Sequence, residues 1–227
     1  MVAPDEPAEA ADVFGGALGQ ARRYAELLAT DGVTRGLIGP RETDRLWDRH
    51  LMNCAVLAEL LPEHGQLVDI GSGAGLPGIV LAMLRPSIQV TLLEPLLRRS
   101  VFLEECVAEL GLANAAVLRA RAEDKAARQR RSDIATARAV APLDRLAGWA
   151  AGLLRPGGEL LAIKGQSAEA ELAAAGPVLA RLGVRSAEVL QARHGRVVSA
   201  TTVVRVVMGG HGREERSGAQ RSRRGVA

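Results

Sequence analysis

Apolar residues recur at helical spacing in two segments before residue 65. The first segment, residues 16–30, predicts a short amphipathic helix with its apolar face at Leu18, Ala21, Ala25 and Leu28. The second, residues 42–61, predicts a longer helix whose apolar stripe is Trp47, Leu51, Cys54, Ala58 and Leu61. Pro62 and Gly65 follow this stripe, and both residue types end helices.

From residue 66 the pattern changes to short apolar runs that alternate with helical segments. The runs predict strands at 66–70, 88–93, 115–118, 132–136 and 159–163, and the segments predict helices at 79–84, 96–110, 143–154 and 168–182. Repeated alternation of this kind indicates βαβ units, hence a doubly wound α/β fold with a mostly parallel sheet. Val189 and residues 197–207 predict two final strands without a helix between them. We therefore expect an antiparallel hairpin at one edge.

This rhythm indicates one domain, residues 15–208, in which N-terminal helices (16–61) precede an α/β core (66–208). Residues 1–14 hold four acids and no base, so we expect a flexible acidic arm. They also lack the positive start of a secretory signal, so we expect a cytoplasmic protein. Residues 209–227 show no periodicity and hold five arginines, which predicts a disordered basic tail.

Composition narrows the classes of function. Two cysteines and four scattered histidines predict neither a disulfide scaffold nor a metal centre. Aromatic residues are 2% of the chain, which weighs against a sheet that stacks bases. No apolar run reaches the roughly 18 residues of a membrane span. Residues 1–124 hold 11 bases and 18 acids, whereas residues 125–227 hold 18 bases and 8 acids; this asymmetry suggests one face directed at a polyanion.

The most informative segment is the glycine-rich turn between Val68 and Gly78, where the first predicted strand leads into a helix. Ligands of doubly wound sheets bind at such strand ends. A dinucleotide fingerprint needs glycine or alanine at its sixth place, where this chain has Leu76. Asp69, just before the turn, suits a ligand with a cationic end. Glu94, at the end of the second predicted strand, is placed to accept hydrogen bonds from ribose hydroxyls.

The spacing of the acid and the glycines resembles the S-adenosylmethionine loop of class I methyltransferases. Five runs of residues make the resemblance specific to one family: RHLMN (49–53), DIGSGAGLPGIVLA (69–82), RAED (121–124), ARAVAPL (137–143) and IKG (163–165). In this order they closely resemble the ribosomal RNA small subunit methyltransferase G family, over residues 18–207. The resemblance implies a class I S-adenosylmethionine-dependent methyltransferase with a Rossmann-like fold. It also implies methyl transfer to N7 of a guanine in the 530 loop of 16S rRNA.

Carried over by position, the resemblance implies that the cofactor is bound by Gly71, Leu76, Ala122, Glu123 and Arg138. The chemistry of the turn adds Asp69, Gly73 and Glu94 to these candidates. His50 and Arg138 are candidates for positioning the substrate. His50 and Asn53 either contact the target nucleotide or cap a contact between a helix and the sheet.

Residues 119–131 hold six bases and two acids directly after the third predicted strand, which places them at the rim of the predicted cofactor site. Such a run is either a solvated face or a phosphate-binding surface. The RNA-binding candidates are Arg119, Arg121, Lys125, Arg128, Arg130 and Arg131. Lys164, at the end of the fifth predicted strand, either binds an rRNA phosphate or is solvated.

Three other functions stay open. They are an S-adenosylmethionine-dependent methyltransferase for another RNA, a protein or a small molecule, an NAD(P)-dependent oxidoreductase, and a non-catalytic RNA-binding module. Leu76 and Asp69 weigh against the oxidoreductase, and an idle glycine turn and Glu94 weigh against the module. Guanine N7 carries a lone pair and no proton, so the expected reaction needs alignment rather than a general base. We expect a monomer without metal that acts on 16S rRNA, free, in the 30S subunit or in an assembly intermediate.

Overall fold

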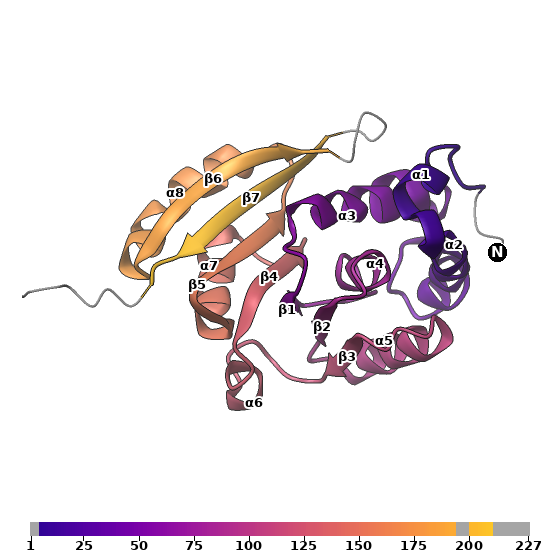
Figure 1. Cartoon of the computed structure of the whole chain (residues 1–227), viewed down its shortest axis with the longest axis horizontal. Coiled ribbons are helices and arrows are strands. Elements are labelled where there is room, and N and C mark those ends of the chain that lie inside the picture. The colour runs from indigo at the N-terminus through magenta and orange to yellow at the C-terminus, as the bar shows by residue number, and fades with distance from the viewer. Residues whose placement is uncertain (1–4, 194–199, 211–227) are drawn as a thin grey trace, which may run out of the picture.

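The computed structural model describes residues 5–193 and 200–210, which build a seven-stranded sheet of order β3-β2-β1-β4-β5-β7-β6 (Figure 1). The strands are β1 Gly65–Ile70, β2 Ile88–Leu93, β3 Ala115–Leu118, β4 Ser132–Arg138, β5 Leu154–Ile163, β6 Val184–Ala192 and β7 Thr201–Met208. β1 to β5 are parallel, and β7 is antiparallel to both β5 and β6. The predicted mostly parallel sheet with an antiparallel edge hairpin is confirmed. Within the hairpin, β7 is the strand that pairs with β5.

Helices cover both faces of this sheet and divide its apolar residues between two cores. The helices after β1, β2, β4 and β5 are α4 Gly78–Leu84, α5 Leu97–Glu109, α7 Leu143–Leu153 and α8 Ala168–Arg181. α4 and α5 lie on one face with the N-terminal helices, and α7 and α8 lie on the other (Figure 1). Because successive strand residues point to opposite faces, Leu67 packs into the first core and Val68 into the second. Burial on both faces explains continuous apolar runs such as residues 160–163 of β5.

The predicted helix 42–61 is a longer helical segment of mixed geometry. It contains 3₁₀ turns at Pro40–Arg45 and Val56–Leu60, π turns at Leu46–Met52 and α3 Asn53–Ala55 between them. The predicted stripe is buried, but so are residues on other faces: Leu46, Met52, Ala55, Val56 and Leu57. The segment packs against α2 Leu18–Leu27, α4 and β6 at once, so a single apolar stripe is not enough.

The prediction of a flexible arm over residues 1–14 is wrong for its last part, where α1 Ala10–Phe14 forms a helix. Ala10, Val13 and Phe14 have the i, i+3, i+4 spacing of one helical face, and all three are buried. The Phe14 ring packs edge-on against Trp47, with ring centroids 6.0 Å apart. Residues 1–4, and the predicted basic tail from residue 211 onward, lie outside the described residues. In the described ranges, no helix has both the length and the apolar character that a membrane span requires.

Candidate active site

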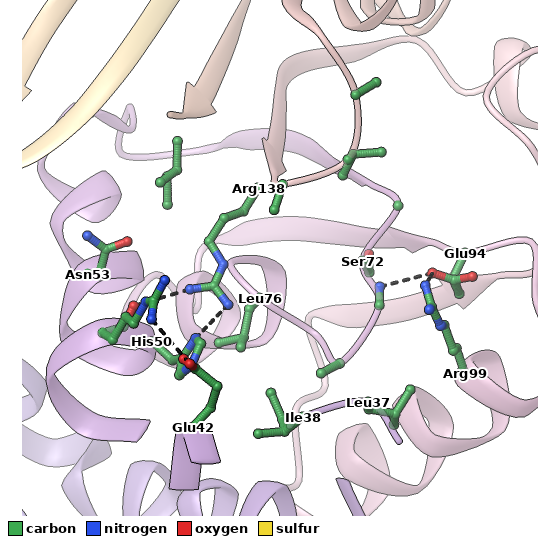
Figure 2. Close-up of a pocket in the computed structure, with 18 of the residues that line it drawn as sticks. Leu37, Ile38, Glu42, His50, Asn53, Ser72, Leu76, Glu94, Arg99 and Arg138 are labelled. Atoms are coloured by element: carbon green, nitrogen blue, oxygen red, sulfur yellow. Dashed lines mark hydrogen bonds and ion pairs between the residues drawn. The ribbon is translucent and has the colours of Figure 1, made fainter. Parts of the chain in front are cut away.

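A cleft of about 1340 Å³ lies at the carboxyl ends of β1, β2, β4 and β5. The strand order reverses between β1 and β4, which is the place where doubly wound sheets bind ligands. The turn after β1 borders the cleft on one side, and residues of the N-terminal helical segment border it on another (Figure 2). Small-molecule sites occupy roughly 300–1,000 Å³. The cleft therefore has room for a second reactant beside a small ligand.

The turn after β1 depends on glycine for two different reasons. Gly71 and Gly73 have φ angles of +66° and +59°, a conformation that other residues rarely adopt. A Cβ at Gly71 would also lie 2.9 Å from a methyl group of Val140, whereas a Cβ at Gly73 would meet no side chain. Because Gly73 lines the cleft, its missing side chain leaves space for a ligand against the backbone.

Asp69 does not face the cleft, contrary to the prediction that it contacts a cationic ligand. Its side chain is fully buried, and its carboxylate accepts hydrogen bonds of 3.1 Å from the Gly78 backbone N–H and from the Thr136 hydroxyl. Burial raises the pKa of this carboxyl to about 6. Asp69 therefore joins the start of α4 to β4 and stabilises the glycine turn from the buried side, away from the cleft.

We expect Asp69→Asn to change how stability depends on pH. The pKa of Asp69 is about 6 in the folded protein, against about 3.9 in unfolded chains. Folding thus favours the protonated carboxyl, and the stability that this provides is lost as pH rises from about 4 to above 6. Asparagine retains an acceptor for Gly78 and a donor for Thr136. In urea unfolding, the free energy of unfolding of the variant relative to that of the wild type should rise by on the order of 2 kcal/mol between pH 4 and pH 8. A stability difference that stays constant across this range would contradict the assignment.

Glu94 follows β2 and lines the cleft, as predicted. It is 2% exposed, and its two carboxylate oxygens accept hydrogen bonds of 3.0 Å, one from the Gly73 N–H and one from the Leu96 N–H. Arg99 lies 3.9 Å away. Each carboxylate oxygen has two lone pairs, so Glu94 fixes the glycine turn and still offers acceptors to hydroxyl groups of a ligand.

Arg138 and His50 meet at the opposite side of the cleft from Glu94 (Figure 2). Arg138, the last residue of β4, donates to His50 Nδ1 at 2.8 Å and to the Arg49 carbonyl oxygen at 3.3 Å. His50 Nε2 lies 3.1 Å from a carboxylate oxygen of Glu42. Burial, together with the charge of Arg138, lowers the pKa of His50 to about 4. The imidazole is therefore neutral at pH 7, with Nδ1 as the acceptor and the proton on Nε2.

Lys164 and Asn53 line the cleft, but both have partners within the protein. Lys164 Nζ donates to a carboxylate oxygen of Glu171 at 2.7 Å and to the Ala141 carbonyl at 2.9 Å, and Lys164 lowers the pKa of Glu171. Asn53 donates to the Thr201 hydroxyl at 2.7 Å, which joins α3 to β7. Asn53 thus links a helix to the sheet, one of the two roles considered for it. Phosphate binding by Lys164 stays a prediction, and its ammonium would have to exchange Glu171 for the phosphate.

Among the predicted cofactor residues, five line the cleft: Gly71, Gly73, Leu76, Glu94 and Arg138. Ala122 and Glu123 do not. Ala122 is buried in the core beneath α7, and the exposed Glu123 accepts a hydrogen bond of 2.6 Å from the Trp149 indole N–H. Their role in binding adenine stays a prediction.

The basic segment 119–131 runs from the carboxyl end of β3 to the amino end of β4, partly as the short helix α6 Lys125–Arg128. None of its six basic residues lines the cleft. Arg130 and Arg131 border a separate hollow of about 560 Å³ with Gln66 and Gln89, at the amino ends of β1 and β2. The prediction that the whole segment lies at the cofactor rim is wrong for these two arginines, because a crossover must return to the edge where the next parallel strand begins.

Two residues that stabilise the site could not be predicted from the sequence. Tyr24 on α2 is fully buried, and its hydroxyl donates to the Ala74 carbonyl at 2.7 Å, which ties an N-terminal helix to the glycine turn. Glu42 pairs with His50 and with Arg49. Nothing distinguishes either residue in the sequence from an ordinary helical tyrosine or an exposed acid.

Comparisons with known proteins agree with this site. The family model for rRNA small subunit methyltransferase G matches residues 17–198. A protein of that name from Thermobifida fusca is 61% identical over 89% of this chain and 85% of its own length. Another, from Streptomyces coelicolor, is 55% identical over 91% of this chain and 86% of its own. In fold, the chain is similar to an S-adenosylmethionine-dependent O-methyltransferase from Thermotoga maritima, with a TM-score of 0.55 and 14% identity over 69% of this chain and 64% of that one.

The class I methyltransferase fold is thereby confirmed, and S-adenosylmethionine is the cofactor. The site fits this group, since the glycine turn leaves the backbone open and Glu94 offers carboxylate oxygens at the end of β2. The length of the match and its level of identity place this chain in the rRNA small subunit methyltransferase G family.

Proposed function

We propose that this protein transfers a methyl group from S-adenosylmethionine to N7 of a guanine in the 530 loop of 16S rRNA. The names of its relatives support rRNA as the substrate. The size of the cleft and its opening at the sheet edge suit a base presented beside the cofactor. We further propose that the protein acts as a monomer in the cytoplasm, on free 16S rRNA, the 30S subunit or an assembly intermediate.

The observation that carries the N7 assignment is that the described cleft residues offer no group ready to remove a proton. Both ring nitrogens of His50 are engaged, and its pKa of about 4 makes it a weak base. The carboxylates of Glu42, Glu94 and Glu171 each have partners in the protein. Guanine N7 needs no deprotonation, because its lone pair is free to attack. Exocyclic amino groups and most other methylated positions lose a proton during the reaction.

The residues of the cleft have separate tasks in this proposal. When bound, S-adenosylmethionine supplies a methyl group activated by its sulfonium. Glu94 and the glycine turn would hold the cofactor, and Arg138 would direct its remaining N–H donors at the reacting groups. Alignment of two reactants supplies up to roughly 7–11 kcal/mol of a reaction barrier, so positioning without acid–base chemistry is sufficient.

The basic segment remains a proposed RNA contact in a modified form. Arg119 and Arg121 follow the carboxyl end of β3, on the same sheet edge as the cleft, and both are exposed. Arg130 and Arg131 lie at the other edge. We therefore propose that Arg119 and Arg121 contact RNA phosphates near the target guanine.

The test of the proposed function is to map methylated nucleotides in 16S rRNA from cells with and without this protein by mass spectrometry. We expect one methylguanine of the 530 loop to be lost with the gene and restored by the wild-type copy. Mild alkali followed by aniline cleaves RNA at N7-methylguanine, and it should cut at this position only when the protein is present. A lost methyl group at another position, or on another atom, would overturn the proposal.

A further inference from the structure

Glu42, His50 and Arg138 form a chain of contacts from the N-terminal helical segment to the end of β4 (Figure 2). Glu42 lies in the 3₁₀ turn Pro40–Arg45, and His50 follows in the π turns. Arg138 is 88 positions beyond His50. The three side chains line the same cleft. The chain of contacts thus joins two parts of the fold at the site.

The direction of these hydrogen bonds requires one tautomer of His50. A guanidinium has five N–H donors and no acceptor, so His50 Nδ1 must accept from Arg138. The proton of the neutral ring is then on Nε2, which donates to Glu42. Without an acceptor at Glu42, the ring could place its proton on Nδ1 and lose Arg138. The carboxylate therefore keeps the imidazole in the form that holds the guanidinium.

We infer that Glu42 is a positioning residue for methyl transfer, which acts through His50 to hold the Arg138 guanidinium in the cleft. This inference rests on the proposed function, because it assumes that Arg138 contacts the reacting groups. Two of the five donors of Arg138 are used by His50 and the Arg49 carbonyl, and the others remain for a ligand. Glu42 itself needs no contact with the cofactor or the RNA.

A purely structural role for Glu42 has little support in its surroundings. Its side chain is 32% exposed, and its second partner, Arg49, is 55% exposed, so their ion pair contributes little to stability. The turn that carries Glu42 is anchored by neighbours that are buried, Thr43, Leu46 and Trp47. Loss of the carboxylate should therefore leave the segment folded and release only His50.

The first test measures the tautomer of His50 directly. Nitrogen-15 spectra of histidine-labelled protein distinguish the ring nitrogen that carries the proton, and His50→Gln assigns the signal. We expect a single Nε2–H tautomer in the wild type and in Glu42→Gln, whose amide oxygen still accepts. Glu42→Ala should show a mixture of tautomers or a shift to Nδ1–H. Asp44→Ala, an exposed acid of the same turn, is the matched control and should keep the wild-type signal. An unchanged tautomer in Glu42→Ala would overturn the inference.

The second test measures single-turnover transfer at saturating S-adenosylmethionine and RNA. A misplaced reacting group costs up to about 100-fold in rate. We expect Glu42→Ala to lower the rate by about 10- to 100-fold while its affinity for S-adenosylmethionine changes by less than about 3-fold. Glu42→Gln should recover most of the rate. Equal losses in Glu42→Ala and Asp44→Ala, or no recovery in Glu42→Gln, would contradict positioning through His50. A wild type that methylates no rRNA would refute the proposed function instead, and the tautomer experiment would still test Glu42.

Discussion

A 16S rRNA fragment in which 7-deazaguanine replaces the target guanine is expected to accept no methyl group from this protein. The analogue carries a C–H where guanine has N7, so it lacks the lone pair that we propose attacks the sulfonium methyl. Its Watson–Crick edge is unchanged, so binding of the RNA should persist. Transfer is measured with radiolabelled S-adenosylmethionine, and binding of the same fragment is measured separately by filter retention.

Inosine at the same position is the matched control for this experiment. It lacks the exocyclic amino group but retains N7, so it should accept the methyl group at a rate close to that of guanine. Methylation of the 7-deaza fragment together with failure on inosine would assign the reaction to the amino group. The protein would then need a group to remove a proton, which the cleft residues described above do not offer in a free state.

Glu94→Ala should weaken S-adenosylmethionine binding by roughly 5- to 150-fold. The change leaves the backbone N–H groups of Gly73 and Leu96 without their acceptor and removes the carboxylate oxygens offered to the ligand. Loss of a buried hydrogen-bond partner costs about 1–3 kcal/mol, which corresponds to this range of affinity. Calorimetry with S-adenosylmethionine measures the effect. NAD should not bind to either protein.

Two further variants separate cofactor binding from folding. Glu104→Ala changes an exposed acid of α5 and should bind S-adenosylmethionine like the wild type. Glu94→Gln keeps one carbonyl acceptor and should fall between the wild type and Glu94→Ala. Thermal unfolding without cofactor shows whether each variant is folded. Wild-type affinity in a folded Glu94→Ala protein would remove Glu94 from the cofactor site.

The order of strands and helices could be predicted from the sequence because each element carries its own period. The run 160–163 at the end of β5 is continuously apolar, since its residues are buried on both faces of the sheet. The glycine turn could be located as well, because glycines directly after a strand are needed where backbone must approach a ligand. These are local properties, and the parallel sheet follows from their alternation.

Tertiary packing decided that residues 10–14 form a helix. A helix of five residues such as α1 is not stable alone, and an acidic composition favours disorder. It forms because Phe14 finds Trp47, 33 positions later in the chain, and Ala10 and Val13 are buried with it. No local pattern in residues 1–14 states that such a partner exists.

The roles of the two acids near the glycine turn were also decided by the tertiary structure. Asp69 and Glu94 both lie at the ends of apolar runs, and the sequence predicts that both contact a polar ligand. Asp69 still belongs to β1, and its buried carboxylate accepts hydrogen bonds from Gly78 at the start of α4 and from Thr136 in β4. Glu94 follows the last residue of β2 and reaches the cleft. A difference of one or two positions at a strand end determines whether a side chain is buried against a helix or lines the site.

What the sequence determined by itself was therefore the α/β class, the glycine turn and the family. The tertiary structure decided which polar groups meet. Arg130 and Arg131 follow Arg119 and Arg121 closely in the chain but lie at the opposite edge of the sheet, because the crossover carries the chain across it. Arg138 and His50 are distant in the chain and are in contact in the cleft. Period and composition report the surroundings of each residue along the chain, whereas hydrogen-bond partners depend on which strand ends and helices the fold brings together.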